Sequence, residues 1–449
     1  MPTRAEGRGL EVFDLNTGIL KLCGIGSVSV SSCGFRTSKR NFSPRLGIAY
    51  RASQSMVIRA GYGIAWDPVN IGRNPLQTYP IVSSASFPAA NGFQFVSPIA
   101  QGIPAVAPPA VGDGQIRVPS NVALELADPN FRRSYIQSWN FMVERESKGW
   151  IGQAGYVGNR SLRLQNRWNA NYGYIGGGTA SQVLRQRFGY LAGANIFSDA
   201  GGFRGYFDSL QASLQRRMNS GHSLRLSYTW SKAQGPWSGT DFGVDGYQIS
   251  TPEYWGIAAK GVKSYDRTHN FNAAFTWQLP FGAGRKFATS GAAAALLGGW
   301  QVNGLYTAYT GGPFTVSSPG ASLNAPGNSQ FADQIKPSVA VFNNPDRWFD
   351  TSAYTQVTAA RFGNSGWNQL RGPGMNNVDL SIYRAFQITE RVGAQFRAEM
   401  FNISNTPHFS NPNGDVSNAA NFGRVTGIAN TGREGIDERM VRFGLRLSF

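Results

Sequence analysis

Apolar and polar side chains alternate with a period of two along several stretches of the chain. Residues 223–230 follow this pattern without an error, and the stretches near 270–279 and 392–400 repeat it with no Lys or Arg on the apolar face. The chain also ends in this way, with apolar positions at Val441, Phe443, Leu445, Leu447 and Phe449. A period of two predicts β-strands with one apolar face. A final strand that ends on an aromatic residue indicates a lipid-facing barrel strand that carries a barrel assembly signal.

The same template predicts eleven strands, most of them long enough to cross a bilayer at the tilt of a barrel. They are expected near 43–50, 56–66, 133–145, 150–157, 206–217, 223–231, 269–280, 300–310, 377–386, 391–402 and 438–449.

The connections between these strands alternate strictly between short and long. The short ones are 51–55, 146–149, 218–222, 281–299 and 387–390, and the long ones are 67–132, 158–205, 232–268, 311–376 and 403–437. A soluble sandwich has no reason to place all its long loops at one end. Bacterial outer-membrane barrels do, with short periplasmic turns and long extracellular loops. The sequence therefore predicts an all-β transmembrane antiparallel β-barrel in the outer membrane of a Gram-negative bacterium.

Tryptophans fall at the predicted strand ends, where aromatic girdles of a barrel meet the membrane interface. Trp66 and Trp230 lie beside long loops, whereas Trp150, Trp277 and Trp300 lie beside short turns, as does Phe449. Any single Trp is better explained by core packing, since buried aromatic residues are common. Only their joint placement favours two girdles.

Composition supports one repetitive architecture and excludes other classes. The 449 residues show no break between two globular halves, and 55 glycines and 13% aromatic residues recur throughout. No apolar run is long enough for a spanning helix, since the best candidate, 291–300, has about half the required length. The net charge of +17 comes from basic residues scattered along the chain with no long Lys/Arg run, which argues against nucleic acid and favours a wet interior or an anionic outer leaflet.

The strand directions predict an incomplete barrel. The last strand must run from a long loop to the periplasm, so counting back through eleven strands makes the first strand run the same way. A complete bacterial barrel has an even number of strands and starts in the periplasm. We therefore expect the carboxyl-terminal part of a larger barrel, which alone would be an open, aggregation-prone sheet.

Several segments, taken in order, resemble the Oar-like TonB-dependent receptor barrels of acidobacterial type. They include NFSPRLGIAYR (41–51), SYIQSWNFMVERE (134–146), SLRLSYTWSKA (223–233), DRTHNFNAAFTWQLPFGAGR (266–285), RGPGMNNVDLSIYRAF (371–386) and RAEMFNISNTPHF (397–409). The resemblance covers residues 41–449 as a partial barrel domain. It implies a transporter whose barrel holds a plug, preceded by a carboxypeptidase-regulatory-like domain. Such plugged barrels have roughly 22 strands, so the eleven predicted here would be the carboxyl-terminal half. The plug, that domain and the TonB box have no counterpart here, so contact with the TonB complex would run only through a missing amino-terminal region.

Residues 1–40 match this family poorly and are expected to be either an extracellular loop or a frameshifted segment. They contain no continuous apolar region, so a secretory signal is not expected. Cys23 and Cys33 lie in the same segment. A loop disulfide is open to them, whereas a metal site would need more ligands nearby.

No catalytic, cofactor or metal site is predicted, and the chain is not expected to be an enzyme. Of the three histidines, His222 is placed in a periplasmic turn, His269 at an outer strand end and His408 in an outer loop. Asp266 and His269 could share a rim, but a lone pair of this kind is usually a structural hydrogen bond. The Gly-rich pieces 176–178 and 282–284 lack the context of a phosphate loop.

The function expected is energy-coupled uptake of a nutrient, with ligand capture by loop aromatics and Arg. The loop candidates are Trp237, Tyr254, Trp255, Trp348 and Trp367, for each of which loop self-packing is the alternative. Polar residues of the inner face would contact plug or water, among them Arg225, Gln395, Arg397, Glu399, Arg442 and Arg446. Two alternatives stay open: a passive pore or adhesion barrel, and a secreted glycan-binding β-sandwich. Expected partners are outer-membrane lipid and the barrel assembly machinery.

Overall fold

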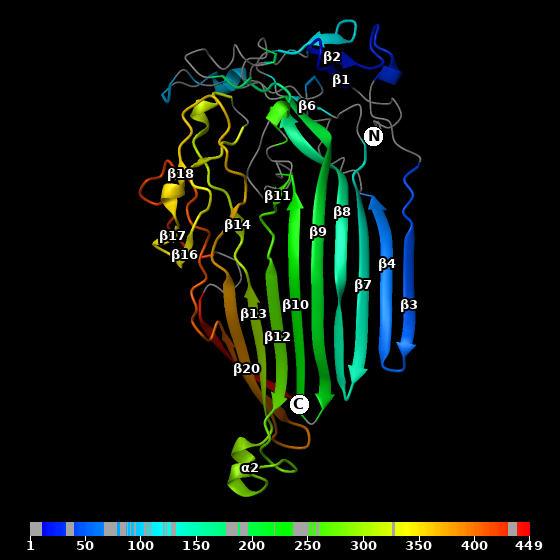
Figure 1. The fold of residues 1–449 in the computed structure, drawn as a ribbon, viewed down its shortest axis with the longest axis vertical. Coiled ribbons are helices and arrows are strands. Elements are labelled where there is room, and N and C mark those ends of the chain that lie inside the picture. Colours follow the sequence, from blue (N-terminus) through cyan, green and yellow to red (C-terminus); the bar gives the residue numbers. More distant parts are fainter. Residues whose placement is uncertain are drawn as a thin grey trace.

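One large antiparallel sheet dominates the computed structural model (Figure 1). The structure describes residues 11–32, 40–66, 132–176, 196–219, 221–236, 260–325, 328–429 and 438–449, with parts of 79–131, 187–188 and 251–256. The sheet has 13 strands, of which eleven form its path in the order β22-β21-β20-β13-β12-β10-β9-β8-β7-β4-β3. The eleven predicted strands are therefore confirmed, and each pairs with its neighbour in sequence order.

The strand bounds agree with the prediction to within a few residues except in β8 and β9 and at the end of β10, which was predicted at residue 231. The eleven are β3 Arg45–Ser53, β4 Met56–Trp66, β7 Tyr135–Ser147, β8 Trp150–Asn169, β9 Ile196–Asn219, β10 His222–Gly235, β12 His269–Gln278, β13 Trp300–Tyr309, β20 Met375–Gln387, β21 Gly393–Phe401 and β22 Met440–Ser448. β8 and β9 continue well past the predicted ends because backbone pairing persists beyond the point where alternation stops. A strand that leaves the bilayer no longer needs an apolar outward face.

Short turns and long loops lie at opposite ends of the sheet (Figure 1). The turn end also holds the carboxyl terminus and the short helix α2, Gly291–Leu297. β3 and β22 both run toward this end, so the predicted directions are confirmed. In the part of the chain that the structure describes, no helix has the length and apolar character needed to cross a membrane.

The register places apolar and polar side chains on opposite faces of the sheet. Leu224, Phe275, Gly304 and Leu380 lie in one row across four strands, and residues opposite one another in a ladder share a face. Large apolar residues on this face are exposed, for example Phe443 at 74%. Because they have no protein to cover them, we assign this face to lipid.

The opposite face carries hydrogen-bonded polar side chains. The Nε2 of Gln301 donates to Asn303 at 2.7 Å, and the Nδ2 of Asn303 donates to Ser381 at 3.1 Å. Arg59 forms an ion pair with Glu144 at 2.9 Å. This pattern matches the wet interior expected of an outer-membrane barrel.

The two edges of the sheet are β22 and β3. Within the described residues neither edge pairs with the other, so the sheet is open in this structure.

The amino-terminal residues pack with the loops at the loop end. β1 Glu11–Asp14 and β2 Ile19–Leu22 form a small sheet with β5 Gln115–Arg117 from the first long loop. Phe13, Leu20 and Ile116 share a core with Tyr172 and Phe188. Cys23 is disulfide-bonded, and Cys33 lies outside the described residues.

The long loop between β13 and β20 forms its own small structures. Their strands are β14 Pro313–Phe314, β15 Asp333–Gln334, β16 Val341–Asn344, β17 Arg347–Phe349, β18 Tyr354–Thr355 and β19 Leu370–Arg371. The remaining elements are β6 Leu124–Leu126 and β11 Gly261–Val262, with 3-10 helices η1 Val30–Ser32, η3 Ile99–Gln101, η6 Pro252–Tyr254, η7 Gly320–Ser322 and η8 Thr351–Ala353.

Candidate functional site

A buried ion pair joins two long loops above the outer ends of β12 and β13. The carboxylate of Asp266 is fully buried and pairs with the guanidinium of Arg371 from β19. Asp266 also accepts a hydrogen bond from the backbone N–H of Ala233 at 2.5 Å, and Arg371 donates to the carbonyl of Gly311 at 3.1 Å. These contacts fix the backbone of the next residue, Arg267.

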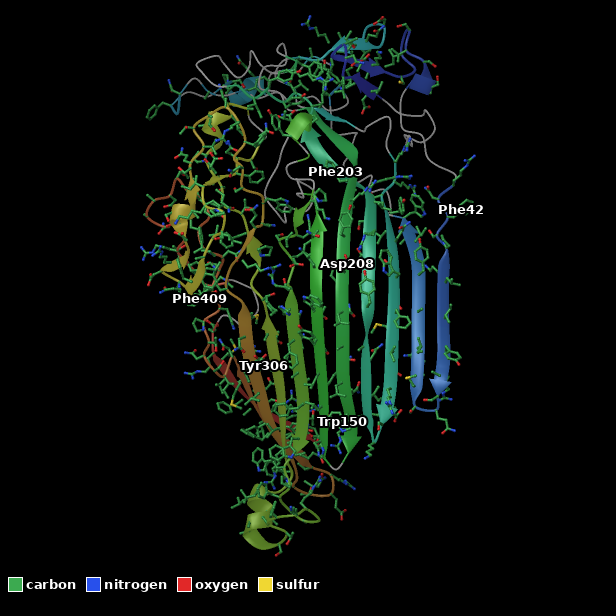
Figure 2. The ribbon with its side chains drawn as sticks, in the orientation of Figure 1. Phe42, Trp150, Phe203, Asp208, Tyr306 and Phe409 are labelled. Atoms are coloured by element: carbon green, nitrogen blue, oxygen red, sulfur yellow. The ribbon has the colours of Figure 1, made fainter. Side chains whose placement is uncertain are left out.

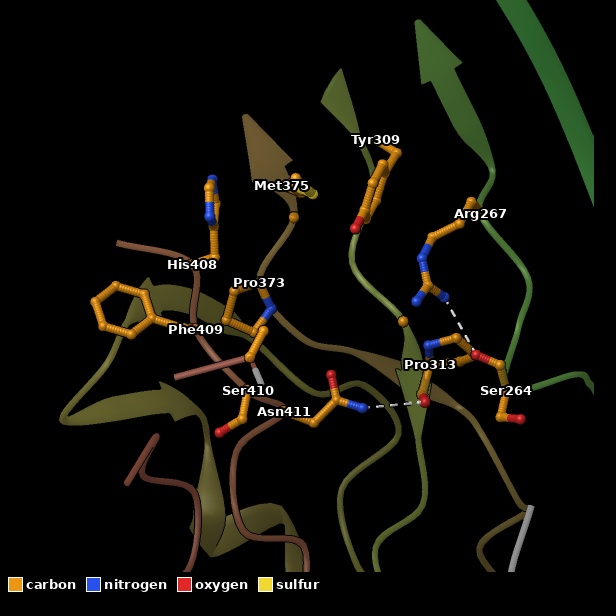
Figure 3. A pocket seen from close by; sticks show the side chains of 13 residues that line it. Ser264, Arg267, Tyr309, Pro313, Pro373, Met375, His408, Phe409, Ser410 and Asn411 are labelled. Atoms are coloured by element: carbon orange, nitrogen blue, oxygen red, sulfur yellow. Dashed lines mark hydrogen bonds between the residues drawn. The ribbon is translucent and has the colours of Figure 1, made fainter. Parts of the chain in front are cut away.

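Arg267 lines a cavity of about 240 Å³ at the outer ends of β12, β13 and β20 (Figure 3). Tyr309 and Met375, which also line it, are register partners on the polar face of the sheet. His408 and Asn411 come from the loop that follows β21. The cavity therefore gathers residues from three connections on the interior side of the loop end.

Hydrogen bonds from Nη1 hold the guanidinium of Arg267 in place, and they leave its Nη2 available. Its Nη1 donates to the carbonyls of Asp266 at 2.8 Å and Ser264 at 3.2 Å, and its Cζ lies 5.5 Å from the Tyr309 ring centroid. In the described part of the chain, its Nη2 has no hydrogen-bond partner. An oriented guanidinium with free donors is suited to a carboxylate, phenolate or phosphate oxygen.

The other polar groups of the cavity are arranged by the backbone around them. The Nε2 of His408 lies 3.0 Å from the carbonyl of Asn376, and this histidine is 3% exposed. The Nδ2 of Asn411 donates to the carbonyl of Pro313 at 3.4 Å, and the hydroxyl of Ser410 donates to Gly427 at 3.0 Å. The volume is below the usual range of a pocket that encloses a whole small ligand, so the cavity suits one group of a larger molecule.

The three histidines do not converge. His222 is the first residue of β10 at the turn end, whereas the ring of His269, on the lipid face, hydrogen-bonds through Nδ1 to the Tyr228 hydroxyl at 2.8 Å. Asp266 pairs with Arg371 instead of His269. No group of three or more His, Cys, Asp or Glu able to hold a metal occurs among the described residues.

Three of the five loop aromatics predicted to contact ligand lie in the described residues, and they pack within the loops. Trp348 is 7% exposed and donates from Nε1 to the carbonyl of Arg371 at 2.7 Å. Trp367 is 3% exposed, and Tyr254 packs on Phe362 beside it. In this structure these three aromatic residues pack against other loop residues. Their contact with a ligand stays a prediction. Trp237 and Trp255 lie outside the described residues.

Acidic residues in the loop between β13 and β20 are bound to basic ones. The Arg361 guanidinium donates two hydrogen bonds to the Asp333 carboxylate, at 2.9 and 2.8 Å, and holds the pKa of that carboxyl below its usual range. A hydrogen bond from Lys336 at 2.7 Å is the main cause that lowers the pKa of Asp350 to about 2. Burial raises the pKa of Tyr354 to about 12. These pairs stabilise the loop next to the cavity.

The tryptophans predicted to form girdles all lie on the apolar face. Trp66 is the last residue of β4, Trp150 and Trp300 begin β8 and β13, and Trp277 precedes the last residue of β12. Trp230 lies five residues before the end of β10 and is 54% exposed. Figure 2 shows Trp150 near the turn end. The shared face follows from the register, while contact with interfacial lipid stays a prediction.

The apolar outer face, the polar inner face and the sorting of turns and loops define an outer-membrane β-barrel protein. The chain belongs to the outer membrane beta barrel domain family, whose model matches residues 1–440. It is therefore a protein of the Gram-negative outer membrane. Both the family and the single large sheet exclude the alternative of a secreted β-sandwich.

Solved structures similar to the chain include outer-membrane transporters and receptors. The outer membrane transporter YddB from Escherichia coli is 9% identical, with a TM-score of 0.47 over 92% of this chain and 41% of that one. A mutant of the ferric enterobactin receptor PfeA from Pseudomonas aeruginosa is 10% identical, with a TM-score of 0.44 over 91% and 40%. The copper transporter OprC is 8% identical, with a TM-score of 0.37 over 91% and 39%.

The chain spans about two fifths of the length of these solved structures. No curated protein matches the chain.

The sequence did not point to Arg267, Tyr309 or Asn411. The only sequence feature that could have indicated Arg267 was its position next to Asp266, a residue that could share a rim with His269. The cavity exists because three loops meet, which no local pattern encodes.

Proposed function

We propose that this chain forms the wall and outer loops of an energy-coupled outer-membrane transporter of the TonB-dependent kind. The loops would capture a ligand outside the cell, and force transmitted from the inner membrane through a plug region would release it inward. The observation that carries the proposal is the cavity around Arg267, which lies at the loop end on the polar face of the sheet.

The position of the cavity matches the first step of uptake. A ligand from outside passes the loops before it reaches the interior, and the cavity lies where the loops join β12, β13 and β20. A passive pore needs only a polar interior. A shaped recess with an oriented cation and an aromatic ring favours a step of specific binding.

The chemistry of the cavity favours an anionic, oxygen-rich group. Arg267 offers the charge, and the Tyr309 ring beneath it holds the guanidinium plane by cation–π contact. A carboxylate or phenolate of a metal chelate would meet the unused Nη2. The chelated metal would be cargo and not a resident cofactor.

The test is uptake by cells in which this gene is the only variable. Cells would receive a panel of radiolabelled ferric chelates of carboxylate and catecholate type, with and without a protonophore. We expect one class to enter only when the gene is present, and the protonophore to abolish entry. Entry that persists without the proton gradient would establish a passive pore, and surface binding without entry would establish an adhesion barrel.

A matched pair of variants tests the cavity itself. Arg267→Gln removes the charge while keeping a hydrogen-bonding side chain, and Arg446→Gln removes one interior charge on β22, away from the cavity. We expect Arg267→Gln to weaken ligand binding about tenfold or more, the usual scale for a charged hydrogen bond, and Arg446→Gln to leave it unchanged. Equal binding by both variants would exclude the cavity as the capture site.

Assembly into the membrane is proposed to depend on the last strand. β22 ends at Ser448, and the Phe449 that follows is 99% exposed. We expect the barrel assembly machinery to recognise this alternating strand. Phe449→Ser should reduce the amount of protein in the outer-membrane fraction relative to Ser448→Thr.

A further inference from the structure

The lipid face carries a polar cluster just beyond the outer girdle. Trp230 lies opposite Leu210, and the next outward pair along the same two strands is Lys232 opposite Asp208. Asp208 lies nearer the loop end of the sheet than Trp150 (Figure 2). Charged residues at this height leave the hydrocarbon and meet the headgroups of the outer leaflet.

Asp208 is already neutralised by its own partners. It accepts hydrogen bonds from the Tyr156 hydroxyl and from the Nη2 of Arg160 at 3.0 Å. The same guanidinium lies 5.2 Å from the Trp139 ring and 5.3 Å from the Tyr206 ring. Arg160 and Asp208 thus form a fixed, charge-balanced pair framed by aromatic rings.

Three further cations surround this pair. Arg204 lies on the same face of β9 two residues before Tyr206, and Lys232 lies directly opposite Asp208. The Nζ of Lys260 lies 4.8 Å from the Tyr206 ring centroid. All three side chains are exposed, and none forms an ion pair in the described part of the chain. We call Arg204, Lys232 and Lys260 the outer-rim cations.

The turn end of the lipid face offers a contrast. There Arg384 packs on Trp300 at 5.7 Å and donates to the carbonyl of Leu296 at 2.8 Å, so its charge is used to cap α2. Among the described residues, Lys260 contacts the Tyr206 ring, and no outer-rim cation caps a helix as Arg384 does. The positive charge of these cations is concentrated on one stretch of the lipid face near the loop end, from Lys232 opposite Asp208 to Arg204 four residues further outward on β9.

We propose that the outer-rim cations bind the phosphate of an outer-leaflet lipid headgroup. A phosphate at this height would meet Lys232 and Lys260 as point charges and Arg204 as a forked donor. The exposed parts of Trp230 and Leu210 below would contact the acyl chains of the same lipid. The site therefore serves lateral lipid binding and is independent of the cavity around Arg267.

The experiment compares lipid binding by three forms of the full chain in zwitterionic detergent micelles. Native mass spectrometry would count bound molecules of a bis-phosphorylated lipid A and of its dephosphorylated form. The test variant carries Arg204→Gln, Lys232→Gln and Lys260→Gln. The control carries Arg225→Gln, Arg442→Gln and Arg446→Gln, which removes the same charge from the interior face.

Each basic residue near an anionic surface contributes about fivefold in affinity, so the test variant should bind the phosphorylated lipid roughly 100-fold more weakly. The control variant should bind as the unchanged protein does, and the dephosphorylated lipid should bind all three forms weakly. Equal weakening in both variants, or none in the test variant, would overturn the proposal. A fourth form with Lys232→Arg and Lys260→Arg should retain binding, which separates loss of charge from misfolding.

A final arm distinguishes a lipid from a free anion. Inorganic phosphate at the same concentration should not compete with the bound lipid. Full displacement of the lipid by inorganic phosphate would mean that the cluster is a general anion site and would refute the lipid assignment.

Discussion

The carboxylate of Asp266 and the guanidinium of Arg371 are 105 positions apart in the sequence and form an ion pair between two long loops. The Asp266 side chain is fully buried, whereas that of Arg371 is 32% exposed. Because Arg267 follows Asp266 directly, the ion pair between Asp266 and Arg371 fixes the position of Arg267 at the cavity. The stability of the loops and the geometry of the candidate site therefore depend on the same contact.

We expect Asp266→Asn to loosen both loops. Removing one partner of a buried pair costs about 3–5 kcal/mol, and the partial exposure of Arg371 places this pair at the lower end. Limited proteolysis in detergent should show faster cleavage of the loop before β12 and of the loop between β13 and β20. Asp346→Asn is the control, because the Asp346 side chain in its ion pair with Arg424 is 84% exposed and such a pair contributes little. Similar cleavage rates in the two variants would show that the buried pair is not what holds the loops.

The sequence was sufficient for the wall of the protein because lipid imposes a strict rule on it. Every second residue of a strand such as β10 must be apolar, so Leu224, Leu226 and Tyr228 mark the strand, its face and its length. The loops are under no such rule. From the sequence alone, Trp348 and Trp367 cannot be distinguished from aromatic residues that bind ligand. In the structure they are buried in loop cores formed by residues that are distant in the chain.

Substitution by Arg should destabilise the protein at one position of β10 and have little effect at the next. Leu226 faces lipid near the middle of the strand, and Ser227 faces the interior beside Asn272. Leu226→Arg should cost about 2–4 kcal/mol, as expected for Arg on the lipid face at the bilayer midplane. Ser227→Arg should be nearly neutral, since its charge can reach water. Urea unfolding in lipid vesicles measures both, and a smaller loss for Leu226→Arg than for Ser227→Arg would reverse our assignment of the faces.

Acid should loosen the loop between β13 and β20. The pKa of Asp350 falls from 3.8 to about 2 through its contacts with Lys336 and Ser352. A carboxyl whose pKa is lower in the folded state stabilises that state above its unfolded pKa, and this contribution is lost as protons bind. We therefore expect loosening as the pH falls from 3.8 toward 2, measured as the rate of cleavage by pepsin.

The variant Asp350→Asn should already be loosened at pH 5 and should respond less to acid. The pKa of Asp333 is also lowered, mainly by its hydrogen bonds from Arg361, so some acid response should persist in the variant. Asp346→Asn should follow the unchanged protein throughout. An acid response of full size in Asp350→Asn would assign the effect to other groups.

A glycine on β13 makes room for an aromatic ring on the neighbouring strand. A Cβ at Gly304 would lie 2.2 Å from Cε1 of Phe275 and 3.0 Å from Cδ2 of Leu380. Gly304→Ala should therefore displace the Phe275 ring and cost about 1–3 kcal/mol, the usual range for overpacking. In the double variant Gly304→Ala with Phe275→Ala the clash is gone, so the double variant should lose less than the sum of the two single losses. The four forms can be compared by urea unfolding in vesicles. A steric contact between the ring and the added methyl group should make the two losses of unfolding free energy non-additive. If the loss in the double variant equals the sum of the two single losses, the ring and the glycine do not interact.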